Sequence, residues 1–192
     1  MRSIPLFTLF GLKVTISAFG IVSFLVAVPP TAWLAARPLR VPLTFSQAVL
    51  AGTLSAIAMF VFEFIHQWGH SRAARSVGYP MTGIHWHSWF SSGIYPADEP
   101  PLPPSVHIRR ALGGFWINVL IGLLLAPPAI YFWPCGGGVA WVIAFTSVWN
   151  FFVLGLGALL PIDIPGVFTT DGGTILHYWR EIKRMQMNTD KR

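Results

Sequence analysis

Charged residues are scarce in this chain of 192 residues. Asp, Glu, Lys and Arg together make up 10% of it, whereas soluble proteins average about 25%. The scarcity is uneven, because residues 14–36, 41–62 and 111–162 contain no charged residue. Hydrophobic residues make up 54% of the sequence. This composition excludes an ordinary water-soluble domain and indicates a protein that crosses a lipid bilayer.

Cysteines and repeats are also lacking. Cys135 is the one cysteine, so no disulfide can form within the chain, and cysteine usage leaves the redox compartment open. The sequence shows neither an internal repeat nor paired broken helices, which are the features that favour a secondary transporter.

The charge-free runs predict four transmembrane helices. A bilayer core of about 30 Å needs about 20 apolar residues per helix. The longest run can hold two helices, because PCGGG at 134–138 is a natural break, and Pro29–Pro30 fits a first span that ends in a loop. The predicted spans lie near residues 14–31, 45–70, 111–132 and 139–160. A signal peptide with Arg2 and Lys13 as its basic region is the alternative for the first run.

Basic residues predict the orientation. With four spans and a cytoplasmic N-terminus, every Lys and Arg except Arg37 and Arg40 lies on the cytoplasmic side. We therefore expect both termini and residues 71–110 in the cytoplasm, Cys135 outside, and the plasma (inner) membrane as the location. This topology and anionic lipid explain the net charge of +6, so no nucleic-acid partner is expected.

The segments outside the spans predict little further structure. MTGIHWHSWFSSGIYP at 81–96 is rich in aromatic and β-branched residues, which predicts a β-hairpin at the cytoplasmic membrane surface. A proline-rich linker follows, residues 1–13 form a strand or an interfacial segment, and 172–187 form a short helix. The expected fold class is an all-α integral membrane protein, a single domain over 1–192, with about four transmembrane helices and this hairpin.

A histidine pair carries the clearest chemical signal. In FIHQWGH at 64–70, His66 and His70 lie about 40° apart on one helix face, one turn apart, so both can reach one zinc ion. Ionisable groups at the edge of a bilayer are costly and usually functional. The alternative is a pair of histidines that hydrogen-bond to neighbouring helices.

A catalytic zinc site needs a third protein ligand and one open position. Asp163 and Asp171 stand near the inner end of the fourth span, in LLPIDIPGVFTTDGG. Asp171, with Gly172 and Gly173 after it, suits a carboxylate projected from a tight turn at a helix start. A plain helix N-cap would explain Asp171 equally well.

These segments resemble the motifs of the site-2 proteases, the M50 family of intramembrane metalloproteases. FIHQWGHSRAARSVGYP is similar to the zinc helix of the family. ALGGFWIN is similar to its A-G-P-x-x-N motif, with Gly114 and Asn118 in register and Phe115 replacing the proline. LGALLPIDIPGVFTTDGG is similar to its N-x-x-P…D-G motif, but Gly157 or Ala158 stands where the Asn is expected. The resemblance covers roughly residues 45–180.

The resemblance implies that His66, His70 and Asp171 bind one zinc ion per chain, and that the partner is a transmembrane or membrane-proximal segment of another protein. It places Gln67 at the position of the water-activating Glu. An amide takes up no proton, and losing a general base costs about 10²–10⁴ in rate. A Glu→Gln replacement made to trap a substrate would leave the same sequence.

Glu63 is the other acid on the zinc helix. It is as well aimed in angle as Gln67, but about 4.5 Å further along the axis from His66. It could act as the base, hydrogen-bond a liganding imidazole, add a ligand or pair with an arginine. Asp163 is a further stand-in with weaker geometric support.

Three functions follow from these residues. The first is an intramembrane zinc metalloprotease, favoured by the intact ligand set. The second is an inactive homologue that binds transmembrane segments as a regulator, favoured by Gln67. The third is a small membrane metal-handling protein that uses Glu63, His66 and His70.

Four histidines lie outside this site. His85 and His87 could form a second metal site, but residues of this kind are more often interfacial, beside Trp86 and Trp89. His107 and His177 have no partner in the sequence and are assigned no role.

Overall fold

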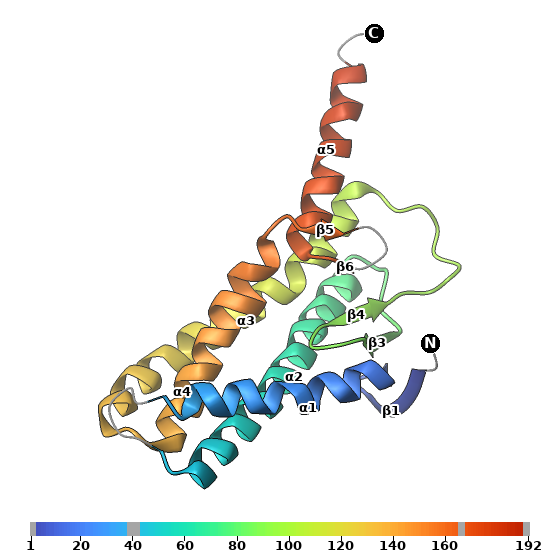
Figure 1. Cartoon of the computed structure of the whole chain (residues 1–192). Coiled ribbons are helices and arrows are strands. Elements are labelled where there is room, and N and C mark those ends of the chain that lie inside the picture. Colours follow the sequence, from blue (N-terminus) through green and yellow to red (C-terminus); the bar gives the residue numbers. More distant parts are fainter. Residues whose placement is uncertain (1–2, 38–42, 165–167, 190–192) are drawn as a thin grey trace.

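The structure is a computed structural model that describes residues 3–37, 43–164 and 168–189. The helices, shown in Figure 1, are α1 (Ala18–Ala35), α2 (Phe45–Ser76), α3 (Pro104–Phe132), α4 (Gly137–Val148) and α5 (Asp171–Thr189). The strands are β1 (Ser3–Leu9), β2 (Leu12–Ser17), β3 (Gly83–Trp86), β4 (Ser91–Ile94), β5 (Asp163–Ile164) and β6 (Phe168–Thr169). A 3₁₀ turn at Trp133–Cys135 extends α3. A π-helical segment at Trp149–Gly155 and a 3₁₀ turn at Leu156–Leu159 extend α4.

The four predicted spans are confirmed in number. Four helical stretches of the described chain are long and apolar enough to cross a membrane, namely Ala18–Ala35, Phe45–Ser76, Pro104–Cys135 and Gly137–Leu159. The break between the last two is at Gly136 and Gly137, whose φ angles of 68° and 88° suit glycine. The first span begins later than predicted, because 14–17 belong to β2 and the Ser17 hydroxyl accepts the Gly20 N–H at 2.9 Å as the helix cap.

Pro29 and Pro30 do not end the first span, so that part of the prediction is wrong. They lie inside α1, which continues to Ala35 and packs on α2. Beside them, the Thr31 hydroxyl lies 2.8 Å from the Ala27 carbonyl and 2.9 Å from the Gly52 carbonyl of α2. A transmembrane helix can contain proline where a neighbouring helix and Ser or Thr side chains satisfy the backbone groups that the proline leaves unpaired.

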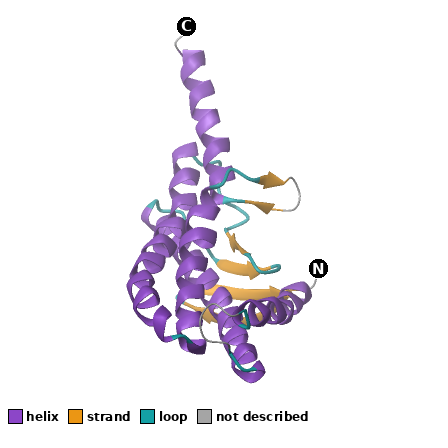
Figure 2. Cartoon of the chain, turned by 60° about the vertical axis from the view of Figure 1, so that its left-hand side comes forward, coloured by secondary structure: helices purple, strands orange, loops and turns teal. Residues whose placement is uncertain are grey.

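The predicted hairpin is present as β3–β4, but it is part of a larger sheet. The strand order is β1-β2-β3-β4, with β2 and β3 parallel and the outer pairs antiparallel. One face of the sheet buries Leu12, Val14 and Ile84 against Phe64 of α2. Figure 1 shows β3 and β4 beside the C-terminal half of α2, and Figure 2 shows the strands to one side of the long helices. Trp86 is part of this core, whereas its neighbour Trp89 is exposed.

The orientation of the bundle stays a prediction, and two cysteine positions can test it. Cys135 is exposed in the turn before α4, and Ser92 lies in β4. In intact cells, an impermeant thiol reagent should label native Cys135. It should label Ser92→Cys, made in a Cys135→Ser background, only after permeabilisation. Labelling of Ser92→Cys from outside would reverse the predicted topology.

Four of the basic residues on which the predicted orientation rests lie outside the described residues, namely Arg2, Arg40, Lys191 and Arg192.

Candidate metal centre

The centre forms where α2 and α3 cross. A Cβ atom on Gly69 of α2 would lie only 2.5 Å from the Gly113 carbonyl oxygen of α3. Small residues permit this close approach of two membrane helices. The crossing places Gly114 and Asn118 of α3 against His66 and His70 of α2.

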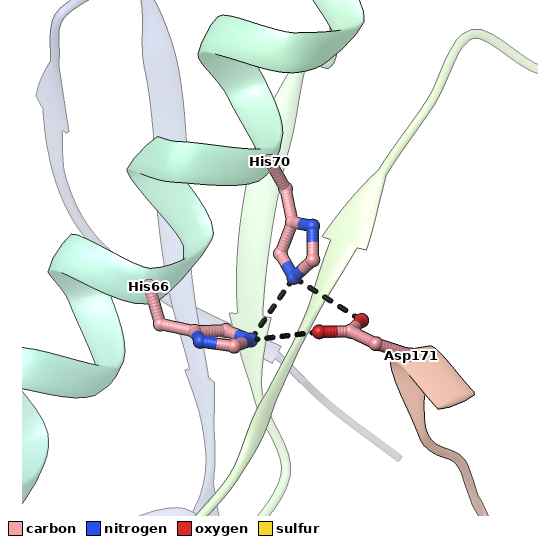
Figure 3. A group of neighbouring side chains, drawn as sticks. All are labelled: His66, His70 and Asp171. Atoms are coloured by element: carbon pink, nitrogen blue, oxygen red, sulfur yellow. Dashed lines mark hydrogen bonds and ion pairs between the residues drawn. The ribbon is translucent and has the colours of Figure 1, made fainter. Parts of the chain in front are cut away.

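The three predicted ligands converge from two helices (Figure 3). His66 Nε2 lies 3.0 Å from His70 Nε2 and 3.4 Å from Asp171 Oδ2, and His70 Nε2 lies 3.3 Å from Asp171 Oδ1. Ligand atoms about 2.0–2.1 Å from a tetrahedral zinc ion are themselves about 3.3 Å apart. Among the described residues, no other group of three His, Cys, Asp or Glu side chains comes close enough to hold a metal.

Hydrogen bonds fix which nitrogen of each histidine faces the centre. His66 Nδ1 lies 3.0 Å from Asn118 Oδ1, and His70 Nδ1 lies 2.7 Å from the Arg110 carbonyl oxygen. These oxygens only accept, so both Nδ1 atoms donate and both Nε2 atoms present lone pairs. Asp171 Oδ2 is buried and has no hydrogen-bond partner among the described residues. Two lone pairs and a carboxylate that face one another need a cation between them, so the residues fit zinc.

A chain of amides orients Asn118. Its Nδ2 donates to Asn150 Oδ1 at 2.7 Å, and Asn150 Nδ2 donates to the Thr146 carbonyl at 2.9 Å. This arrangement leaves Asn118 Oδ1 free to accept from His66. Asn150 lies in the π-helical segment, a distortion frequent at functional sites. Asn150 is not among the residues predicted from the sequence, although a strongly polar residue inside a charge-free span is itself a signal.

Asp171 is not explained as a helix cap. The Gly173 N–H donates to Thr170 Oγ1 at 3.1 Å, so Thr170 caps α5. The Asp171 carboxylate is therefore available to the histidines. Gly172 permits this position, because a Cβ atom there would collide with the Leu159 carbonyl.

Glu63 and Gln67, the candidate residues for the general base on α2, both bond to β4. Glu63 Oε1 accepts from Ser91 N–H at 2.9 Å and from Ser91 Oγ at 2.8 Å, and Gln67 Nε2 donates to the Ser91 carbonyl at 3.1 Å. The structure therefore does not bring Glu63 to either histidine as a hydrogen-bond partner. Asp163 accepts from Thr169 Oγ1 at 2.6 Å on the exposed β5–β6 hairpin and is not in the metal-competent group.

No family model and no curated protein matches the sequence of this chain. Among solved structures, the chain is similar to the Site-2 Protease from Methanocaldococcus jannaschii, with 22% identity and a TM-score of 0.63 over 91% of this chain and 70% of that chain. The chain has a site-2 protease fold. Likeness at this identity describes the fold, so the chemistry of this chain rests on its own residues.

Gly114 makes room for the centre within this site-2 protease fold. A Cβ atom there would lie 2.5 Å from both His66 Nε2 and His70 Nε2. We expect Gly114→Ala to displace the histidines and to abolish zinc binding, as measured by metal content after mild purification. Gly138→Ala is the control, because a Cβ atom there meets ordinary contacts at 3.6 Å. Full zinc content in Gly114→Ala would show that the metal lies elsewhere.

The other four histidines of the chain are not part of the metal-competent group. The rings of His85 and His87 lie 5.0 Å apart, and His85 Nδ1 contacts Thr15 Oγ1 at 2.8 Å. Burial, and then the neighbouring His85, lower the pKa of His87. His107 stacks on Tyr178 of α5 with ring centroids 4.0 Å apart, and His177 packs edge-on to the same ring.

Arg110 ties the proline-rich linker to the centre. Its guanidinium is buried, donates to Glu99 Oε2 at 2.9 Å, and lies 4.1 Å from the ring centroid of Tyr95. Hydrogen bonds from Arg110 hold the pKa of Glu99 below its usual value of 4.5, and burial raises the pKa of Tyr95 to about 12. The carbonyl of the same Arg110 orients His70.

The Glu99–Arg110 pair should make stability depend on pH. A lowered folded-state pKa stabilises the protein above pH 4.5, and that contribution is lost as the pH falls through the folded value. Glu99→Gln should therefore lose less stability than the native chain on acidification below pH 4.5, as measured by unfolding midpoints in detergent with chelator present. Asp98→Asn, a change of an exposed neighbouring acid, should behave like the native chain. Identical pH profiles for all three would exclude the role of the pair.

Proposed function

We propose that this chain is an intramembrane zinc metalloprotease of the site-2 protease type. Its substrates would be transmembrane or membrane-proximal segments of other membrane proteins. The supporting observation is the trio of His66, His70 and Asp171, whose ligand atoms lie 3.0–3.4 Å apart with both histidine tautomers set for metal binding. The site-2 protease fold of the chain agrees with this function.

Zinc in this position would lower the pKa of a water molecule and polarise the scissile carbonyl. The residues of the chain orient the ligands and hydrogen-bond to the reacting groups. Asn118 and the Arg110 carbonyl orient the two imidazoles, and partners of this kind typically change metal affinity 10–100-fold. Gln67 can donate or accept a hydrogen bond but cannot take a proton. The proposed protease is therefore slow, because no general base stands at position 67.

A second candidate is an inactive homologue that binds transmembrane segments as a regulator. The bonds to Ser91 favour it, because the Glu63 carboxylate holds β4 instead of standing free beside the histidines, and the Gln67 amide, which is no acid, holds the same strand. The metal-handling interpretation relied on Glu63 as a third ligand, and that carboxylate is absent from the group of metal-competent side chains.

Metal content and proteolysis, measured side by side on the purified chain, separate these candidates. The proposal predicts bound zinc, weak cleavage of a transmembrane reporter, and faster cleavage by Gln67→Glu. Bound zinc with no cleavage by either chain would favour the regulator. Absence of zinc after mild purification would exclude the zinc protease and the metal-handling protein.

A further inference from the structure

A second feature of the chain lies away from the histidines. An open groove of about 440 Å³ lies between the β1–β2 hairpin and the helices α1 and α2. It is lined by apolar side chains, among them Leu6 and Phe7 of β1, Ile21 of α1, and Phe60 and Val61 of α2. Its volume is in the range of small-molecule sites, which is about 300–1,000 Å³.

The depth of the groove in the membrane follows from its walls. Ile21 and Val61 belong to membrane-spanning stretches, and their exposed fractions are 43% and 48%. β1 is an edge strand whose seven residues are all exposed. Unpaired backbone groups of an edge strand need water, which the bilayer core lacks. The hairpin therefore lies at the headgroup level, and the groove runs from there into the acyl region.

Basic residues lie beyond the headgroup end of the groove lining, with Arg72 about two turns past Phe64 on α2. Along α2, Phe60, Phe64, Trp68 and Arg72 follow one another at one-turn intervals. The rise from Phe60 to Arg72 is about 18 Å, close to half of a bilayer core of about 30 Å. The Arg72 guanidinium lies 5.8 Å from the Trp68 ring centroid, and Arg72 has no acidic partner among the described residues.

Arg75 joins the hairpin to this end of the groove. Its guanidinium donates to the Phe10 carbonyl at 2.7 Å, and the Phe10 ring lies 6.1 Å from that of Trp68. One face of α2 thus runs from apolar and aromatic to basic over the depth of one leaflet. This order matches a phospholipid, with an acyl chain below and an anionic headgroup above.

We propose that this groove is a binding site for one anionic phospholipid. An acyl chain lies against Phe60 and Val61, and the headgroup phosphate pairs with Arg72 and Arg75. The site is separate from the zinc ligands and does not depend on proteolysis. In this proposal the β1–β2 hairpin is the wall that holds the lipid.

The test is native mass spectrometry of the full chain, purified in neutral detergent and titrated with phosphatidylglycerol or phosphatidylcholine. Phosphatidylglycerol should bind more tightly. Arg72→Gln should weaken it about fivefold, the equivalent of about 1 kcal/mol per basic residue near a membrane surface. Arg109→Gln, the same charge change at an exposed position on α3, should leave the affinity unchanged.

The acyl part is tested by filling the groove. Val61→Trp should abolish binding of both lipids, whereas Val49→Trp, on the same helix outside the groove lining, should not. Ile21→Trp fills the groove from α1 and replaces Val61→Trp if that variant does not fold. Equal affinity for the two lipids, equal effects of Arg72→Gln and Arg109→Gln, or lipid binding that survives a folded groove-filling variant would each overturn the proposal.

Discussion

Gln67→Glu is expected to raise the rate of proteolysis by about 10²–10⁴, the range that a general base contributes. Position 67 follows His66 directly and lies between the two histidines along the axis of α2. A carboxylate there can accept the proton of the attacking water and deliver it to the leaving amine, whereas an amide can only hydrogen-bond.

The contact with Ser91 adds a second expected effect. Gln67 Nε2 donates to the Ser91 carbonyl of β4 at 3.1 Å, and a carboxylate has no hydrogen to donate. The Ser91 carbonyl then loses its side-chain partner, at a cost of about 1–3 kcal/mol if it stays unpaired. The Gln67→Glu variant should therefore cleave its substrate faster than the native chain and unfold more easily.

Cleavage of a transmembrane reporter and the unfolding midpoint measure these two effects. Gln67→Met is the matched control, because it also loses the bond to Ser91 but adds no acid. It should be destabilised to a similar degree and should cleave no faster. If the native chain cleaves as fast as Gln67→Glu, another group is the base. Full activity that survives both Glu63→Gln and Asp163→Asn would then refute the acid–base assignment.

Removal of both histidines should reduce bound zinc from one ion per chain to none. His66 and His70 supply two of the three converging ligand atoms, and a lone Asp171 carboxylate does not hold zinc in competition with water. We expect this result for the double variant His66→Ala, His70→Ala, measured by elemental analysis after mild purification.

The chain provides a matched control for this loss. His85→Ala, His87→Ala removes two neighbouring histidines that lack a third partner among the described residues, and its zinc content should stay at one per chain. Unchanged zinc in the His66, His70 variant, or loss of zinc in the His85, His87 variant, would assign the metal to a different site.

Local pattern was sufficient for part of the fold. The charge-free runs predict four spans because hydropathy is a property of each segment alone. The errors lie at the ends of elements, where neighbours decide. Residues 14–17 pair with β1 and β3 as part of β2, and α1 continues through Pro29 and Pro30 because α2 packs beside it.

The candidate site also combines residues that a local pattern predicts with residues that only the tertiary structure brings together. Helical periodicity by itself places His66 and His70 on one face. The two glycines after Asp171 and the family resemblance favoured Asp171 over Asp163, and the structure places Asp171 beside the histidines while Asp163 bonds to Thr169.

The sequence by itself thus determined a four-span membrane protein with a zinc-competent histidine pair and no acid at position 67, because each of these is local to one segment. The tertiary structure decided three further points. Asp171 completes the trio, the Asn118–Asn150 pair orients His66, and Glu63 bonds to Ser91 of β4 and to neither histidine. His66 and Asn118 are 52 residues apart, and Glu63 and Ser91 are 28 apart. Contacts at such separations depend on how helices cross and strands pair, which no local pattern of residues specifies.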